Sequence, residues 1–144
     1  MIPYSRVLAV VDLTEDSDAV VARARQLAHK YEARLALLHV VEYVPVEPMG
    51  EALMPAIDIE QDLVMSAVTR LDELARKHRL GEVTKRVEVG SIKGETVRVA
   101  EEEKIDLVVV GSHERHGLAM LFHGTEETVL HAAPCDVLAV RLGG

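Results

Sequence analysis

The feature that most constrains the fold is an apolar run, Ile105–Val110, that ends at Gly111. Its only charged residue is Asp106, and three consecutive valines follow soon after. An unbroken run rich in β-branched side chains is typical of a strand buried on both faces, as in a parallel sheet. The polar, glycine-containing residues that follow predict that the chain leaves the sheet in a loop just after Gly111.

The rest of the chain alternates strand patterns with helix patterns. Four further runs have strand character, and they are residues 6–11, 34–41, 83–89 and 136–140. Four segments are predicted to be helices, and they are residues 14–31, 59–80, 96–104 and 124–133. Five strands alternating with four helices predict an α/β fold with the parallel sheet as the middle of three layers. Residues 83–89 alternate apolar and polar side chains, which predicts an edge strand.

Composition limits the functions that this chain can have. Its 144 residues fit one domain, which we expect to span residues 1–144. The net charge is -8 and no lysine or arginine cluster stands out, so we expect no nucleic-acid partner. No apolar stretch could span a bilayer, and the first residues lack the features of a signal peptide. We therefore expect a cytoplasmic protein without a membrane partner.

The pattern also predicts where a ligand would bind. Open parallel sheets bind ligands at the carboxyl ends of their strands, where the strand order reverses. If the order is 3-2-1-4-5, Asp12 at the end of the first strand and Gly111 at the end of the fourth line one crevice. Gly124 and Thr125 open the last predicted helix, whose free N–H groups could hold an anion. The loop matches neither Gly-x-Gly-x-x-Gly nor the Walker sequence, so the ligand stays open at this point.

Four blocks spread along the chain in order resemble the universal stress protein family. They are Val10–Ser17, Leu38–Val40, Asp106–His113 and Ala133–Val140. The resemblance implies a doubly wound, Rossmann-like sheet of order 3-2-1-4-5, of the adenine nucleotide alpha hydrolase-like kind. It also implies a role in stress tolerance and a homodimer joined through the last strand, Asp136–Val140. An uncovered strand at the edge of a sheet invites pairing with a second copy, which supports the same expectation.

The resemblance further implies an ATP site, with magnesium as the companion ion. Asp12 and Val40 would contact the nucleoside, whereas Gly111, Gly124 and Thr125 would donate hydrogen bonds to phosphate. His113 stands near the presumed phosphate position and would add a donor when protonated. Asp12 has a competing interpretation, because an aspartate at a strand end often bonds to its own turn.

One position departs from the motif of the family members that bind ATP, which is Gly-x-x-Gly, nine residues, then Gly-Ser/Thr. Glu114 stands where the second glycine belongs, and it adds a Cβ and a negative charge beside an anion. A branch of the family lacks this motif and does not bind ATP. Two hypotheses therefore stay open: a stress-response protein that binds adenine nucleotide without efficient turnover, and a dimeric protein-interaction module with a vestigial crevice.

Catalytic and metal chemistry have little support in the sequence. An ATPase, the third hypothesis, would need a positioned base and a cationic or metal clamp on the γ-phosphate, and Arg115 is the one candidate cation in the loop. His113, His116 and His123 fall in one segment, but without paired cysteines we read them as titratable side chains rather than zinc ligands. Cys135 has no identifiable activating base, so we interpret it as a packing residue.

Overall fold

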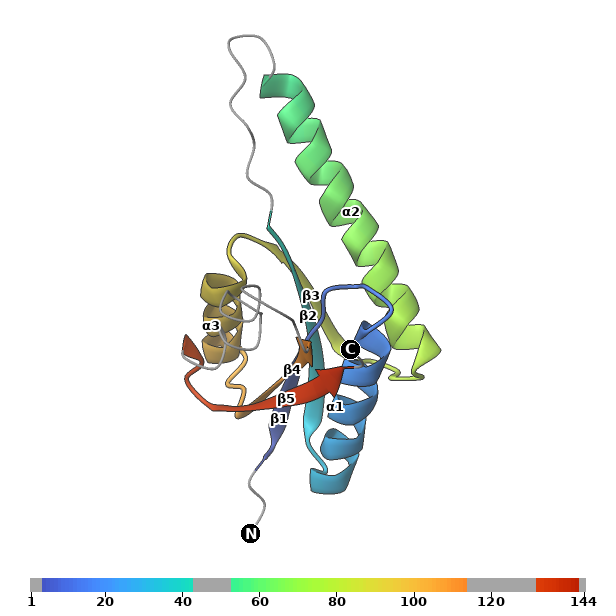
Figure 1. The fold of residues 1–144 in the computed structure, drawn as a ribbon, viewed down its shortest axis with the longest axis vertical. Helices are drawn as coiled ribbons and strands as arrows, with labels where there is room; N and C mark the ends of the chain where they lie inside the picture. The colour runs from blue at the N-terminus through green and yellow to red at the C-terminus, as the bar shows by residue number, and fades with distance from the viewer. Residues whose placement is uncertain (1–3, 43–52, 114–131, 143–144) are drawn as a thin grey trace.

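The structure, a computed structural model, describes residues 4–42, 53–113 and 132–142 (Figure 1). Its elements in chain order are β1 (Arg6–Val10), α1 (Ser17–Tyr31), β2 (Arg34–Val41), α2 (Leu53–Lys77), β3 (Thr84–Val89), α3 (Ile92–Glu102), β4 (Leu107–His113) and β5 (Asp136–Leu142). The five strands form one sheet of order β3-β2-β1-β4-β5, and all four strand pairs are parallel. The predicted fold class and strand order are confirmed.

Helices cover both faces of the sheet, as Figure 1 shows. Alternate residues of β1 point to opposite faces: Val7 and Ala9 pack against α1 and α2, whereas Leu8 and Val10 pack on the side of α3. These four side chains are buried, as β-branched and aliphatic runs in central parallel strands require. Full burial of a valine or leucine side chain contributes about 1.5–3 kcal/mol, so the buried side chains of central strands such as β1 stabilise the fold.

The predicted edge strand is confirmed in β3, which lies at one end of the sheet. Arg86 of β3 makes ion pairs with Glu88 in the same strand at 3.0 Å and with Glu102 of α3 at 2.9 Å. Arg98 of α3 in turn pairs with Glu88 at 2.8 Å. These pairs tie the edge strand to the helix that follows it, and they hold both arginines against carboxylates.

Two helices begin earlier than predicted. The structure starts α2 at Leu53, six residues before the predicted start, and places Pro55 in its first turn. Proline is tolerated there because the N–H groups of a first turn have no partner within the helix. α3 starts at Ile92 rather than at residue 96, because the Ser91 hydroxyl accepts a hydrogen bond from Gly94 N–H at 2.9 Å and caps the helix.

The last two strands are longer than predicted. β4 continues through His113 and β5 through Leu142, whereas the sequence analysis ended them at Gly111 and Val140. The two strands support each other over these added residues, since Ser112 lies opposite Arg141 and His113 opposite Leu142. The predicted helix at 124–133 lies mostly outside the described residues.

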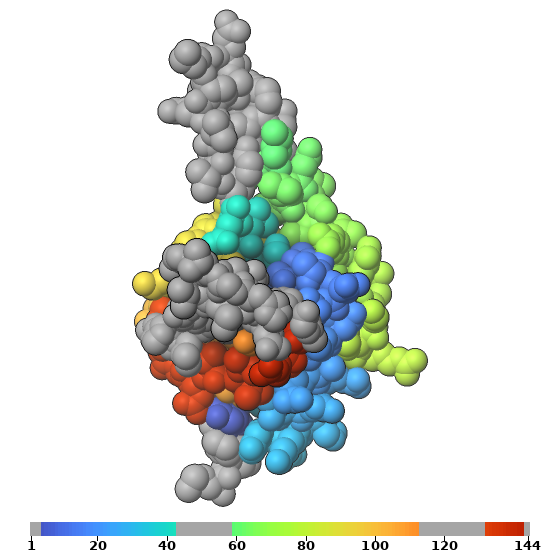
Figure 2. Space-filling model, in the orientation of Figure 1, coloured from blue at the N-terminus to red at the C-terminus, as the bar shows by residue number. Residues whose placement is uncertain are grey.

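The first half of α2 extends beyond the sheet, as Figures 1 and 2 show. Four large apolar side chains of α2 are exposed: Ile59, Leu63, Met65 and Val68. The second half instead buries Ala67, Leu71 and Ala75 against the sheet. Within the described part of the chain, no helix is both long and apolar enough to cross a membrane.

Candidate functional site

The carboxyl ends of all five strands lie at one level along the sheet. Val10 pairs with Leu38 and Ala9 pairs with Val109, so continuing these registers places Asp12 level with Val40 and with Ser112. The Val11 N–H donates to the Leu38 carbonyl oxygen at 2.9 Å, which carries the β1–β2 ladder past the end of β1. On the outer strands, Glu88 lies opposite Val40 and Arg141 lies opposite Ser112.

We call these five residues the edge row: Glu88, Val40, Asp12, Ser112 and Arg141. Side chains alternate between the two faces of a strand, so the row lies on one face. Val10 and Val110 lie two residues before Asp12 and Ser112, and both belong to the core on the side of α3. Val40 belongs to that core itself. The edge row therefore lies at the carboxyl edge of the α3 face, across the point where the strand order reverses.

Asp12 bonds to the turn that follows it. Its Oδ1 accepts hydrogen bonds from Thr14 N–H at 3.0 Å, from the Thr14 hydroxyl at 2.7 Å and from the Ser17 hydroxyl at 3.1 Å. Desolvation opposes the charge, but these bonds outweigh it and hold the pKa of Asp12 below its ordinary value. Within the described part of the chain no hydrogen bond reaches Oδ2. The turn interpretation is thus confirmed.

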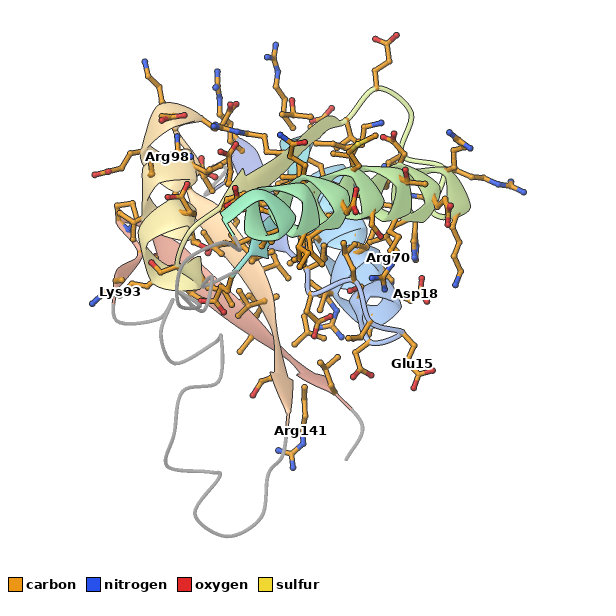
Figure 3. All side chains as sticks on the ribbon, turned by 90° about the horizontal axis from the view of Figure 1, so that it is seen from above. Glu15, Asp18, Arg70, Lys93, Arg98 and Arg141 are labelled. Atoms are coloured by element: carbon orange, nitrogen blue, oxygen red, sulfur yellow. The ribbon has the colours of Figure 1, made fainter. Side chains whose placement is uncertain are left out.

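The residue after Asp12 has an unusual backbone conformation. Leu13 lies in the left-handed region at φ 63°, although its side chain is buried and contacts the core under α1 and α2. This conformation costs a residue with a Cβ about 1–2 kcal/mol, so surrounding contacts must hold it. One such contact is the Leu13 carbonyl oxygen, which accepts a hydrogen bond from the Arg70 guanidinium of α2. Figure 3 shows Arg70 beside the start of α1, near Asp18.

Gly111 lies in a tightly packed position. A Cβ placed on Gly111 would lie 2.6 Å from Leu142 Cδ1 and 3.1 Å from Val20 Cγ2. The first distance is shorter than any real side chain tolerates, so Gly111 lets the end of β5 and the start of α1 approach β4 closely. This structural role stands beside the phosphate contact that the family resemblance implies.

His39 fixes the geometry of the same edge. Its Nδ1 lies 2.8 Å from the Val11 carbonyl oxygen, and because a carbonyl only accepts, Nδ1 carries the proton. The bond ties β2 to the residue that precedes Asp12. The position of His39 inside an apolar strand predicts a hydrogen-bonded core histidine, and the bond to Val11 confirms it, although the sequence gave no sign that the bond lies at this edge.

The structure brings some predicted site residues together and leaves others undescribed. Asp12, Val40 and Gly111 lie at the carboxyl edge of the sheet, and His113 is the last residue of β4. Gly124 and Thr125, with Glu114 and Arg115, lie outside the described residues.

Sequence reasoning missed Ser112 and Arg141 because it ended β4 and β5 too early. The available signal was Leu142, which continues the alternating apolar pattern of β5 beyond Val140.

Other candidate chemistry is weaker in the described part of the chain. Burial, followed by the charges of Asp106 and Asp136, raises the pKa of the Cys135 thiol, so the thiol stays protonated and unreactive near neutral pH. Cys135 also packs against the core on the side of α3, in agreement with its interpretation as a packing residue. Among the described residues no three His, Cys, Asp or Glu side chains gather as metal ligands.

A pocket of about 750 Å³ lies at the opposite edge of the sheet, away from the edge row. It is lined in part by Arg34 and Thr84, the first residues of β2 and β3, and by Arg79 after the end of α2. It is therefore distinct from the crevice that the strand order creates.

The chain is similar in sequence and in structure to universal stress proteins. The model of the universal stress protein family matches residues 3–141. Universal stress protein A homolog 2 from Coxiella burnetii is 34% identical over 142 residues, which cover 98% of this chain and 97% of that protein. Universal stress protein UspA from Lactobacillus plantarum has the same fold, with a TM-score of 0.77 at 22% identity, covering 96% of this chain and 98% of that one. A universal stress protein solved in complex with cAMP gives a TM-score of 0.66 at 26% identity, covering 96% and 97%.

Proposed function

The chain belongs to the universal stress protein family, and from that premise we propose that it binds an adenine nucleotide across the edge row without efficient turnover. ATP with magnesium is the proposed ligand, and the nucleoside lies toward Val40 and Asp12. The phosphates lie toward Gly111 and the end of β4, where Gly124, Thr125 and His113 would contribute donors.

The edge row is the observation that carries this proposal. Val40 is apolar, and Asp12 is a carboxylate whose Oδ1 accepts the hydrogen bonds of its turn; a carboxylate oxygen suits a ribose hydroxyl donor. The strand order reverses beside Asp12, and open α/β sheets bind nucleotides at such points. A structural relative solved in complex with cAMP supports an adenine ligand for this fold.

Slow turnover follows from what the described edge offers. Hydrolysis needs a base that positions water and groups that neutralise charge on the transferred phosphate. The Asp12 Oδ1 already accepts three hydrogen bonds within its turn, and its lowered pKa makes it a weak base. Glu88, the other carboxylate of the edge row, is paired with Arg86 and Arg98.

Calorimetric titration of the nucleotide-free protein with ATP and magnesium tests the proposal. We expect saturable binding by the unmodified protein and tighter binding by Glu114→Gly, which restores the motif glycine. Glu114→Gln is the matched control, because it removes the charge but keeps the Cβ. Absence of binding by the unmodified protein and by Glu114→Gly would overturn the proposal.

The exposed apolar side chains of α2 favour a second candidate function. Ile59, Leu63, Met65 and Val68 lie on a helix that extends beyond the sheet, which suits a protein-interaction module. This function needs no nucleotide. A protein that binds no nucleotide but loses partner binding after Met65→Lys would have the second function rather than the first.

A further inference from the structure

We infer that Arg141 is the cation that contacts the phosphate groups, so that it sets the preference of the crevice for adenine nucleotides over adenosine. The inference rests on the proposed function and assigns a role that the sequence analysis did not give to this residue. It makes Arg141, rather than the loop residue Arg115, a basis of nucleotide selectivity.

The strand register gives Arg141 its place. It lies opposite Ser112 of β4, in the row that continues through Asp12 to Val40. Neighbouring strands are about 4.8 Å apart, so Arg141 stands about 10 Å from Asp12 along the row. A ligand with its nucleoside at Val40 and Asp12 would extend its phosphates toward β4 and β5. Figure 3 shows Arg141 at the carboxyl end of β5, next to the end of β4.

The charges of the edge row also support Arg141 as the residue that contacts phosphate. The protein carries a net charge of -8, and the edge row holds two carboxylates: Asp12, and Glu88, which pairs with Arg86 and Arg98. Arg141 is the one cation among the five residues of the row.

The side chain suits the ligand. Arg141 is exposed, and the residue on each side of it, Val140 and Leu142, is buried toward α1 and α2. Its strand neighbours thus anchor the backbone while the guanidinium lies at the surface of the opposite face. A guanidinium presents its N–H groups as a planar fork that matches two phosphate oxygens, whereas a lysine acts as a point charge.

The test compares ATP, cAMP and adenosine in calorimetric titrations of the full chain. We expect Arg141→Gln to weaken ATP and cAMP binding by about tenfold or more and to change adenosine binding by less than about twofold. Arg141→Lys should recover part of the ATP affinity because it keeps the charge. Arg34→Gln is the matched control: it removes the same charge from an exposed strand residue at the opposite edge, and it should leave all three affinities unchanged.

The outcomes separate this inference from the proposed function. Equal losses for ATP and adenosine, or no loss for either, would overturn the role of Arg141 while leaving nucleotide binding in place. An unmodified protein that binds none of the three ligands would overturn the proposed function and this inference with it. Thermal unfolding of Arg141→Gln checks the fold, and if that variant unfolds, the ATP-to-adenosine ratio of Arg141→Lys decides in its place.

Discussion

Gly111 has two roles at one position: it allows close packing, and it is a proposed phosphate contact. Its missing side chain leaves room for Leu142 and Val20, which bring β5 and α1 close to β4. Packing therefore favours glycine at this position even without a ligand. A sequence motif that contains it cannot, on its own, separate packing from phosphate binding.

We predict that Gly111→Ala lowers the free energy of unfolding by about 1–3 kcal/mol, because the new Cβ overlaps the Leu142 side chain. Urea denaturation measures the change. In a Leu142→Ala background the same substitution should cost less, since the nearest atom has been removed. Equal costs in both backgrounds would show that the overlap with Leu142 is not the cause.

Asp106 gives the fold a specific dependence on pH. Its Oδ2 accepts hydrogen bonds from Ser5 N–H at 2.8 Å and from the Ser5 hydroxyl at 2.9 Å, and its Oδ1 accepts one from Arg6 N–H at 3.0 Å. Partial burial opposes the charged form, but these bonds outweigh it and lower the pKa of Asp106. The carboxylate thus fastens the start of β4 to the start of β1.

We predict that Asp106→Asn lowers the free energy of unfolding by about 1–2 kcal/mol at pH 7, because the amide nitrogen cannot accept a hydrogen bond. A pKa that is lower in the folded state gives stability that is present above the unfolded pKa of about 4 and is lost as the pH falls through the folded value. Denaturation of both proteins from pH 7 to pH 2 should therefore show the difference shrinking below about pH 4. A difference that stays constant to pH 2 would contradict this role.

At the scale of elements, α2 holds the start of α1 and the turn before it. Lys77 and the adjacent His78, at the end of α2, contact the Asp18 carboxylate at 2.8 and 2.7 Å, and the two bonds lower the pKa of Asp18. Arg70 bonds to the Leu13 carbonyl oxygen in the turn that contains Asp12. The helix therefore supports the proposed nucleoside contact from outside the crevice.

We predict that Arg70→Met weakens nucleotide binding more than it weakens folding, because the strained Leu13 turn loses its hydrogen bond and Asp12 loses its fixed position. The expected loss is about 1 kcal/mol in binding, measured by calorimetry beside thermal unfolding. Thr69→Met, on the adjacent exposed residue of α2, is the control. An Arg70→Met variant with unchanged nucleotide affinity would show that Arg70 of α2 does not support the site.

The sequence predicted the elements better than their ends, for physical reasons. Buried parallel strands need continuous apolar runs, so Ile105–Val110 and its equivalents identified the strands, whereas the strand order was implied by the family resemblance. Polar residues at strand ends carry no such signal, so Ser112 and Arg141 were placed outside the sheet although they pair with each other. The start of α2 lies earlier than the predicted residue 59, because the first turn of a helix accepts a proline such as Pro55.

The candidate site, too, could be predicted only where apolar runs indicate it. Asp12 and Gly111 could be predicted because they end apolar runs, and strand order then brought them together. The left-handed turn at Leu13 and its bond to Arg70 depend on contacts between residues 57 positions apart, which no local pattern reveals.

At the scale of the whole molecule, β5 lies at the end of the sheet, opposite β3. We propose that two copies pair through this strand, now with the bounds Asp136–Leu142. Among the described strands only β4 pairs with β5, and a strand edge without a neighbour offers its backbone groups to a second chain.

We predict that sedimentation shows a dimer at micromolar concentration, and that Ala139→Pro shifts it toward the monomer because proline cannot donate a backbone hydrogen bond. Ala139 is exposed, and Ala139→Ser serves as the control. A monomer at that concentration, or a dimer unaffected by the proline in a folded variant, would contradict pairing through β5.

In the proposed function, an adenine nucleotide binds at the carboxyl edge of the sheet, across the edge row. The most direct measurement is the titration of isotope-labelled protein with ATP and magnesium, followed by the amide NMR signals of each residue. We expect saturable shifts of the amide signals of Asp12, Val40, Ser112 and Arg141. The signals of Arg34 and Thr84, at the opposite edge of the sheet, should not change. Shifts centred on Arg34 and Thr84, or no saturable shifts at all, would contradict the proposed function.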